Sequence, residues 1–369
     1  MSSSTEASPR PGLLATITEN RFLALLSESD VPLSRSDIAV LSGISKPAIS
    51  DAARRLEDAG VIVSTGVREG KRGGVAALYG INPDRGHSVS LALDSAFVAA
   101  RSVRLDGTMA FDKTEPLPHD ASSDYVIAVA SRLLESIVKA TPTPLLAVAI
   151  SVADPVDRRT GDIIPMADSV FPAGHFNPVR DLNIQAAETK VDNDVNWATL
   201  AEHSVGEMMD VDDFLFVYLG AGLGAGLFLG GNLQRGARGL AGEIGHLRAP
   251  GGEDLTRTLT RLGFGNSARA YGLDLEASKE LFSGPGPAPS TREALDNLAV
   301  AIANMVTLLN PSAVVLGGPL AGLKPLVKYL SVTVPGLSLD RVDVVVGTRT
   351  PLDGATHEAH RMARARLGF

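Results

Sequence analysis

The 369-residue sequence contains no cysteine, which excludes disulfide bonds, thiolate zinc sites, iron–sulfur clusters and a cysteine nucleophile. It also lacks an uncharged apolar run of about 18 residues, which a membrane-spanning helix would need. Residues 1–12 are rich in serine and proline and have no apolar segment of the signal-peptide type. These absences predict a soluble cytoplasmic protein without a membrane partner.

An excess of basic residues is missing as well. The chain has 34 Lys and Arg against 42 Asp and Glu, and this net charge of −8 argues against general binding of nucleic acid. Residues 1–86, however, hold 10 basic and 10 acidic side chains, so this part could bind DNA locally if the basic ones share one face. The length predicts two or three domains, and 44% hydrophobic with 21% charged residues is typical of globular proteins.

The first 86 residues predict a compact helical unit that ends in a small hairpin. A short amphipathic helix is expected over residues 20–27, and Pro32 breaks the chain after it. Ser34 and Asp37 have the spacing of a capping box that opens a second helix, and Gly43 ends that helix. A third helix is predicted to begin after Ser45 as its N-cap and to end near residue 59, with Gly60 as its C-cap.

The polar residues of this unit indicate DNA binding. Lys46, Ser50 and Arg54 recur at every fourth position on one face of the third helix, which a tight glycine turn separates from the second. Such a pair of helices is typical of a helix–turn–helix motif that lays its second helix in the major groove. The hairpin tip suits phosphates or a minor groove, because it carries Arg68, Lys71 and Arg72. The alternative is a helical interaction module with solvated charges.

From residue 87 onward the pattern changes to strands that alternate with helices, as in an α/β fold. Strands are expected at 87–93, 98–104, 145–152, 214–219, 225–230 and 313–316, and helices at 125–140, 292–309 and 357–367. A further helix is expected to begin near Asn193, with the single tryptophan, Trp197, in its core-facing side. No repeat of fixed period is visible.

Several short fragments occur in a fixed order along the chain. In the N-terminal part these are residues 34–39, 43–45 and 56–60. In the remainder they are NDVN at 193–196, GAGLGAG at 220–226, GEIGH at 242–246, LGG at 316–318 and GA at 354–355. Together they resemble the ROK family of repressors, open reading frames and sugar kinases. The resemblance covers nearly the whole chain, implies a winged helix–turn–helix in front of an actin-like, two-lobed sugar-kinase body, and adds Arg35 and Ser45 to the candidate DNA-binding residues.

The resemblance implies that Asn193 and Asp194 contact a sugar, with the aspartate as general base toward a sugar hydroxyl in the family's kinases. Taken alone, Asn and Asp are ordinary helix caps. Glu243 and His246 offer a carboxylate and an imidazole to vicinal hydroxyls, the alternative being a solvated turn. Asp154 adds a carboxylate near the expected pocket. Such acidic surroundings favour a neutral sugar over a sugar phosphate, unless an arginine such as Arg235 or Arg238 reaches the phosphate.

The glycines of 220–226 leave two interpretations open. They would let backbone N–H groups approach a phosphate, or they would simply form a tight hairpin.

Two departures from the family pattern predict a protein without catalytic activity. The family's Asp-x-Gly-Gly-Thr loop, which holds ATP phosphates, is here Asp94, Ser95, Ala96 and Phe97. Without that cradle phosphoryl transfer should fail, so Asp194 would be only the vestigial position of the base. The family's zinc-binding cysteine cluster is also missing from residues 253–266, and no metal or cofactor is expected.

The sequence therefore predicts an α/β protein with a winged helix–turn–helix at 13–86 and an actin-like effector-sensing and oligomerisation domain at 87–369. The function that fits is a transcriptional repressor of sugar metabolism that binds double-stranded operator DNA and a sugar effector as a homodimer or homotetramer. A ligand-independent DNA-binding protein and an active sugar kinase are the alternatives.

Overall fold

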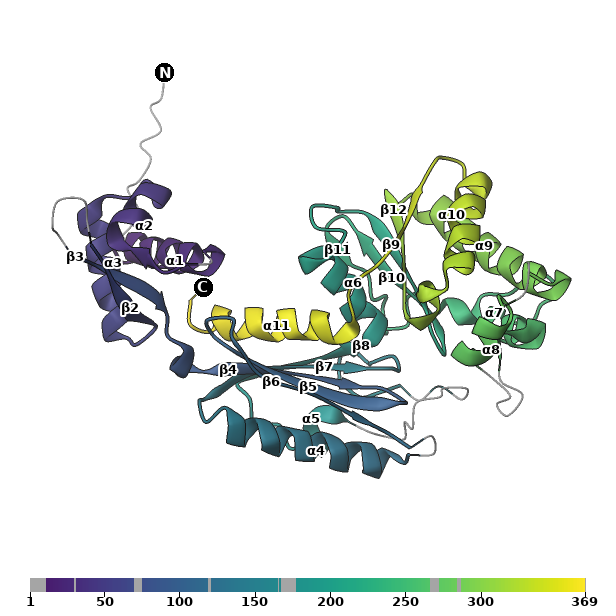
Figure 1. Cartoon of the computed structure of the whole chain (residues 1–369), viewed down its shortest axis with the longest axis horizontal. Coiled ribbons are helices and arrows are strands. Elements are labelled where there is room, and N and C mark those ends of the chain that lie inside the picture. Colours follow the sequence, from purple (N-terminus) through teal and green to yellow (C-terminus); the bar gives the residue numbers. More distant parts are fainter. Residues whose placement is uncertain are drawn as a thin grey trace, which may run out of the picture.

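A computed structural model of the chain describes residues 11–29, 31–69, 75–118, 121–164, 166, 177–265, 272–283 and 287–368. Figure 1 shows three parts side by side, which we call the head, lobe I and lobe II. The head combines three helices with a small antiparallel sheet of order β1-β3-β2. Its elements are α1 Pro11–Glu28, β1 Leu33–Ser34, α2 Arg35–Ser42, α3 Lys46–Asp58, β2 Ile62–Glu69 and β3 Val75–Ile81.

The helix boundaries of the head confirm some predictions and correct others. Ser34 and Asp37 form the predicted capping box at the start of α2, and Gly43 ends that helix with a φ of 70°. Helix α1 is longer than the predicted 20–27, because a proline is tolerated at its first position and nothing after it breaks the helix. Ser45 occupies the N-cap position of α3, but its side chain accepts no capping hydrogen bond there. Helix α3 ends at Asp58 with Ala59, rather than Gly60, as its C-cap.

Lobes I and II contain five-stranded sheets of the same topology. In each sheet the first three strands of the lobe are antiparallel neighbours, the fourth pairs parallel with the first, and the fifth pairs parallel with the fourth. Lobe I has the order β6-β5-β4-β7-β8, with β4 His87–Leu93, β5 Phe97–Arg104, β6 Met109–Pro116, β7 Leu145–Val152 and β8 Glu188–Asn193. Lobe II has the order β11-β10-β9-β12-β13, with β9 Phe214–Leu219, β10 Leu223–Leu229, β11 Asn232–Leu233, β12 Ala313–Gly317 and β13 Asp343–Val346.

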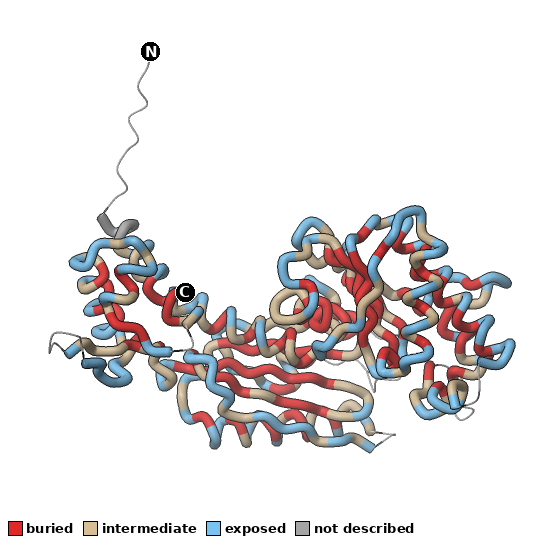
Figure 2. The backbone as a smooth tube through the Cα atoms, turned by 45° about the horizontal axis from the view of Figure 1, so that its top comes forward, coloured by how far each residue is buried: buried red, intermediate tan, exposed pale blue. Residues whose placement is uncertain are grey.

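Helices cover both faces of each sheet. In lobe I, α4 Ser123–Ala140 packs on one face and α11 Pro351–Ala365 on the other. In lobe II, α9 Pro289–Leu309 and α10 Lys324–Leu337 cover one face, and α6 Asp194–Val205 packs on the other. The short helices are α5 Pro178–Asp181, α7 Leu255–Leu259 and α8 Leu275–Glu280. The cores lie between these layers, and Figure 2 shows the strands as the most deeply buried segments.

Helix α6 joins the two lobes. Its Val195 and Ala198 belong to the hydrophobic cluster of lobe II, whereas Trp197 belongs to a cluster with Ala147 and Ala149 of lobe I. Trp197 is fully buried, as predicted, and its Nε1 donates to the Ile150 carbonyl at 2.9 Å. Each lobe therefore packs on one side of the same helix.

None of the described helices combines the length and the hydrophobicity that a membrane span requires.

Candidate functional site

A cleft of about 670 Å³ lies between the two lobes. Its walls come from the tips of the β4–β5 and β9–β10 hairpins, which occupy equivalent positions in the two sheets, and from residues that follow β7, β8, β12 and β13. The carboxyl ends of parallel strands are where open α/β sheets bind their ligands. Because the two sheets share one topology, the edge at which each lobe would bind a ligand faces the same cleft.

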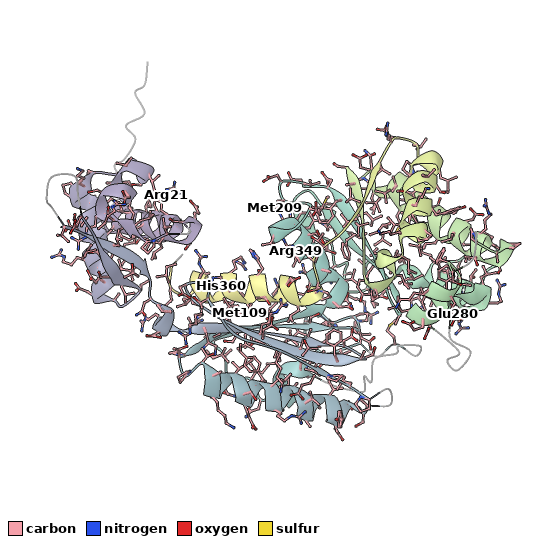
Figure 3. All side chains as sticks on the ribbon, in the orientation of Figure 1. Arg21, Met109, Met209, Glu280, Arg349 and His360 are labelled. Atoms are coloured by element: carbon pink, nitrogen blue, oxygen red, sulfur yellow. The ribbon has the colours of Figure 1, made fainter. Side chains whose placement is uncertain are left out.

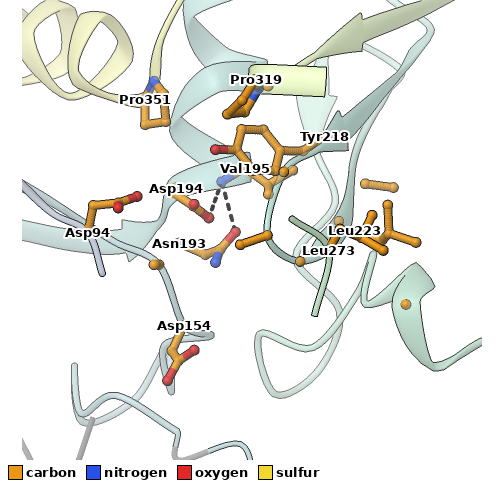
Figure 4. Close-up of a pocket in the computed structure, with 18 of the residues that line it drawn as sticks. Asp94, Asp154, Asn193, Asp194, Val195, Tyr218, Leu223, Leu273, Pro319 and Pro351 are labelled. Carbon is orange, nitrogen blue, oxygen red and sulfur yellow. Dashed lines mark hydrogen bonds between the residues drawn. The ribbon is translucent and has the colours of Figure 1, made fainter. Parts of the chain in front are cut away.

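The five predicted effector-binding residues all line this cleft: Asp154, Asn193, Asp194, Glu243 and His246. Asp154 follows β7, and Figure 4 shows it with Asn193, Asp194 and Asp94 around the same space. The structure thus brings the predicted set together, while its role in sugar binding stays a prediction.

Asn193 and Asp194 stand where β8 gives way to α6, and the first is a genuine helix cap. Asn193 Oδ1 accepts from the Val195 N–H at 2.9 Å, and Asp194 Oδ1 accepts from the same N–H at 2.7 Å (Figure 4). Capping uses only the amide oxygen of Asn193, so its Nδ2 group keeps both hydrogens for a ligand. The cap interpretation and the ligand interpretation are therefore compatible.

Burial and like charges shape the electrostatics of the cleft. Burial raises the pKa of Asp194 well above its ordinary value, and the carboxylates of Asp94, Glu243 and Asp154 raise it further. Burial also raises the pKa of Asp94. The Tyr218 hydroxyl has its pKa raised by burial and by Asp194 and Asp94, so it stays protonated and able to donate a hydrogen bond.

Sequence reasoning missed Tyr218 and Arg349, which also line the cleft. The available signal was position, since Tyr218 is the next-to-last residue of strand β9, just before the glycine loop, and Arg349 follows β13. Neither arginine that the sequence suggested for a phosphate lines the cleft: Arg238 is exposed, and Arg235 is engaged elsewhere. Arg235 Nε donates to Asp192 Oδ2 at 2.6 Å, and Asp192 Oδ1 accepts from Asn196 Nδ2 at 2.7 Å. Arg235 thus fixes the end of β8.

The glycines near the cleft serve close packing at several positions. A Cβ on Gly226 would lie 1.7 Å from Thr199 Oγ1 of α6, and one on Gly224 would lie 2.7 Å from a Val195 methyl group. A Cβ on Gly242 would lie 1.8 Å from the Ala225 carbonyl oxygen. These glycines let α6 and the segment 242–246 lie directly on β10. Gly222 has open space around it, so both interpretations of the loop tip stay open there.

In the hairpin tip that corresponds to the family's phosphate loop, the polar groups form hydrogen bonds with one another. Asp94 Oδ1 accepts from the Ala96 N–H at 2.8 Å, and the Asp94 N–H donates to the Phe97 carbonyl at 3.0 Å. The Phe97 ring packs in a small cluster with Leu352 of α11. A phosphate would have to displace the Asp94 carboxylate to reach the Ala96 N–H group.

The residues that correspond to the family's zinc cluster do not fit a zinc ion. Helix α7 buries Leu255, Thr256, Thr258 and Leu259, and neither alkyl nor hydroxyl side chains form a tetrahedral zinc site. In the described part of the chain, no group of three or more His, Asp or Glu side chains is placed to hold a metal ion.

The head presents part of the predicted DNA-binding set on one helix. Lys46 and Arg54 are exposed on α3 with Ser50 half-buried between them, and Arg54 lies 3.4 Å from Asp51. Ser45 is exposed at the start of this helix.

Two predicted contacts, Arg35 and Arg68, have partners within the head. Arg68 donates to Asp37 at 2.7 Å, and the Arg35 guanidinium lies over the Tyr79 ring, 5.2 Å from its centre. Lys71 and Arg72 lie outside the described residues.

Comparison with known proteins agrees with this architecture. The model of the ROK family matches residues 103–262. The chain is 26% identical over 239 residues to the xylose repressor of Caldicellulosiruptor bescii, a match that spans 63% of this chain and 57% of that repressor. It is 30% identical over 205 residues to the N-acetyl-D-glucosamine kinase of Pectobacterium carotovorum, spanning 48% of this chain and 67% of the kinase.

The fold is shared along nearly the whole length with a ROK family transcriptional regulator described as a homologue of the Escherichia coli MLC protein. That crystal structure superposes with a TM-score of 0.66 at 20% identity and covers 96% of this chain and 98% of its own. Three findings point to one family: the motifs that line the cleft, the family model that matches residues 103–262, and the 30% identity over two thirds of the N-acetyl-D-glucosamine kinase. This chain belongs to the ROK family.

Proposed function

We propose that this chain is a transcriptional repressor that binds operator DNA through a winged helix–turn–helix at 13–86 and senses a sugar with the actin-like body at 87–369. One observation carries the proposal: the cleft keeps Asn193, Asp194, Glu243 and His246, whereas the hairpin at 94–97 bonds to itself. Sugar-contacting groups without a phosphate cradle suit a sensor better than a kinase. Relatives named xylose repressor, and a fold neighbour described as a transcriptional regulator, support the same function.

The sugar acts through the cleft in this proposal. A sugar that prefers one relative placement of the lobes shifts the population toward it and so changes how two heads of a homodimer or homotetramer meet the operator. Carboxylates accept from the sugar hydroxyls, while the Asn193 amide and the Tyr218 hydroxyl donate to them. No cofactor takes part.

The test is release of DNA by a sugar. An operator is first selected by the protein from random-sequence DNA, and its affinity is then measured with and without D-xylose, D-glucose and N-acetyl-D-glucosamine. We expect one sugar to weaken operator binding by at least about tenfold, which corresponds to about 1.4 kcal/mol of coupling between the sites. Unchanged operator affinity with every sugar of an extended panel would favour ligand-independent DNA binding instead.

A second prediction concerns ATP. Because the Ala96 N–H is bonded to Asp94 and Phe97 packs on Leu352, we expect no ATP-dependent phosphorylation of these sugars. Turnover is measured by ADP release, with an active sugar kinase of the family as the positive control. The kinase relatives make the opposite outcome meaningful: ADP release that Asp194→Asn abolishes would identify an active enzyme.

A further inference from the structure

Glu202 lies in the last turn of α6 and is fully buried, yet its carboxylate has no role in the site described above. Three backbone N–H groups donate to it. Its Oε1 accepts from Thr348 at 2.7 Å and from Arg349 at 2.8 Å, and its Oε2 accepts from Glu207 at 3.0 Å. Hydrogen bonds to a charged acceptor are about twice as strong as neutral ones, so this arrangement compensates a buried carboxylate.

Two glycines make room for this carboxylate. A Cβ on Gly206 would lie 2.3 Å from Glu202 Oε2, and a Cβ on Gly347 would lie 2.6 Å from Oε1. Both glycines flank the residues whose N–H groups donate. The surroundings of Glu202 are therefore shaped for a carboxylate on both sides.

The donors belong to two different crossings of the chain between the lobes. Glu207 lies in the connection from α6 to β9, the first strand of lobe II. Thr348 and Arg349 lie in the connection from β13 of lobe II back to α11, which packs on lobe I. Glu202 thus ties both crossings to the helix that packs against the two lobes.

The second crossing also forms part of the cleft wall. Residues 347–351 all line the cleft, and Arg349 stands at the end of α11 nearest lobe II (Figure 3). Helix α6 therefore begins at Asn193 and Asp194 of the cleft wall and, through Glu202 in its last turn, also fixes residues 348–349 of that wall. We call the contact between the Glu202 carboxylate and the N–H groups of Glu207, Thr348 and Arg349 the joint. A ligand that brings the two sides of the cleft closer must change the geometry of this joint.

Helix α11 leads from this joint to the head. It lies close on α6, since a Cβ on Gly354 would be 1.9 Å from the Trp197 carbonyl oxygen. Toward its other end, Ala359 and Met362 belong to one hydrophobic cluster with residues of the head core such as Phe22. The Glu28 carboxylate at the end of α1 opposes the lowering of the Arg364 pKa by burial, so the two charges are near each other. Figure 1 shows the chain's C-terminus beside α1.

We propose that Glu202 is a positioning residue for the sugar response. By tying both interlobe crossings to α6, Glu202 makes α11 move when the cleft closes, and the movement of α11 then displaces the head. This inference rests on the proposed sensing function. Glu202 touches neither sugar nor DNA in it. Its effect passes through the 348–349 backbone and through α11.

The experiment compares Glu202→Gln with Glu207→Gln. The first variant places an amide NH₂ group against at least one N–H donor, and the second removes the same charge from an exposed side chain nearby. Operator affinity is measured without sugar and at saturating concentrations of the panel sugar that releases wild-type DNA. We expect Glu202→Gln to keep its sugar-free operator affinity but to lose the sugar effect, from at least about tenfold to less than about twofold. Glu207→Gln should behave as wild type.

A general loss of stability would not remove the sugar effect at saturation while leaving sugar-free DNA binding intact. Gly347→Ala perturbs the same joint from the other lobe, and the double variant should lose no more of the sugar effect on operator affinity than the worse single variant. Additive losses, or a full sugar effect in Glu202→Gln, would overturn the proposal. A wild-type protein that ignores every sugar would instead refute the sensing function itself.

Hydrogen exchange of the wild-type protein tests the joint even if Glu202→Gln does not fold. At saturating sugar, the amides of Glu207, Thr348 and Arg349 should exchange more slowly together with those of α11. Unchanged exchange at these amides, in a protein whose DNA is released by the same sugar, would place the transmission elsewhere.

Discussion

Asp194→Ala is expected to abolish sugar-triggered release of the operator while sugar-free DNA binding stays intact. Asp194 lines the cleft at the start of α6, far along the chain from the head. Removing one polar partner leaves a sugar hydroxyl buried and unpaired, which costs about 1–3 kcal/mol, or about one to two decades in sugar affinity. The change leaves the head and its contacts with α11 untouched.

Calorimetry gives the sugar affinity and a DNA-binding titration gives the release. Asp343→Ala is the matched control, because it removes an exposed carboxylate of lobe II at β13. A variant at Asp194 that still responds to the same sugar at the same concentration would show that the effector binds elsewhere.

The same residue makes the response depend on pH. Its pKa is raised in the folded protein above the ordinary 3.8 by burial and by Asp94, Glu243 and Asp154. Asp194 therefore costs stability, in an amount that grows as the pH rises from the ordinary pKa to the raised pKa and is complete above it, and Asp194→Asn should melt at a higher temperature than the wild type at pH 7. The gain should disappear below the ordinary pKa, where the wild-type carboxyl is protonated in both states. Sugar affinity of the wild type should fall as the pH drops through the raised pKa, since the carboxylate is lost as an acceptor.

The strands that frame the cleft could be predicted from the sequence, because buried strands are short apolar runs between glycine or polar turns. The expected 87–93, 145–152 and 214–219 coincide with β4, β7 and β9. Helix α1 was harder, since Gly, Thr and Leu in 12–18 lack a clear apolar period. The matching topology of the two lobes was not visible either. Two sheets can share the same strand order without sharing a similar pattern of side chains, so the sequence shows no repeat.

Some residues of the candidate site could likewise be predicted from the sequence, and others could not. Asn193, Asp194, Glu243 and His246 occur in motifs whose residues are close in sequence, so their neighbourhood in the cleft could be predicted. Arg235 and Glu202 could not be placed, because their partners are far away in the chain: Asp192 lies 43 residues from Arg235, and Thr348 lies 146 from Glu202. A buried carboxylate in a helix has no local signature when backbone groups satisfy it.

Lys46→Ala combined with Arg54→Ala is expected to lower operator affinity by at least about two decades and to make its salt dependence shallower by about four in the log–log slope, since two charges are lost in each of two heads. Both side chains are exposed on α3, whereas Arg35 and Arg68 bond within the head. Arg54 pairs at 3.4 Å with the exposed Asp51 of the same helix, and an exposed pair of this kind is weak enough to leave the arginine available to a phosphate. A pair of body substitutions, Lys139→Ala with Arg292→Ala, removes the same charge from exposed helices and should leave affinity and slope unchanged.

Ser50→Ala separates sequence recognition from charge attraction. Ser50 lies between Lys46 and Arg54 along α3 and carries no charge, so its loss should alter the preferred operator sequence with little effect on the salt slope. The preference is measured by repeating the selection from random-sequence DNA with the variant. If the double substitution changed neither affinity nor slope, α3 would not enter the groove, and the three helices of the head would serve a protein partner instead. If only the slope changed, α3 would contact the phosphates without reading the bases, and recognition would have to come from another element of the head.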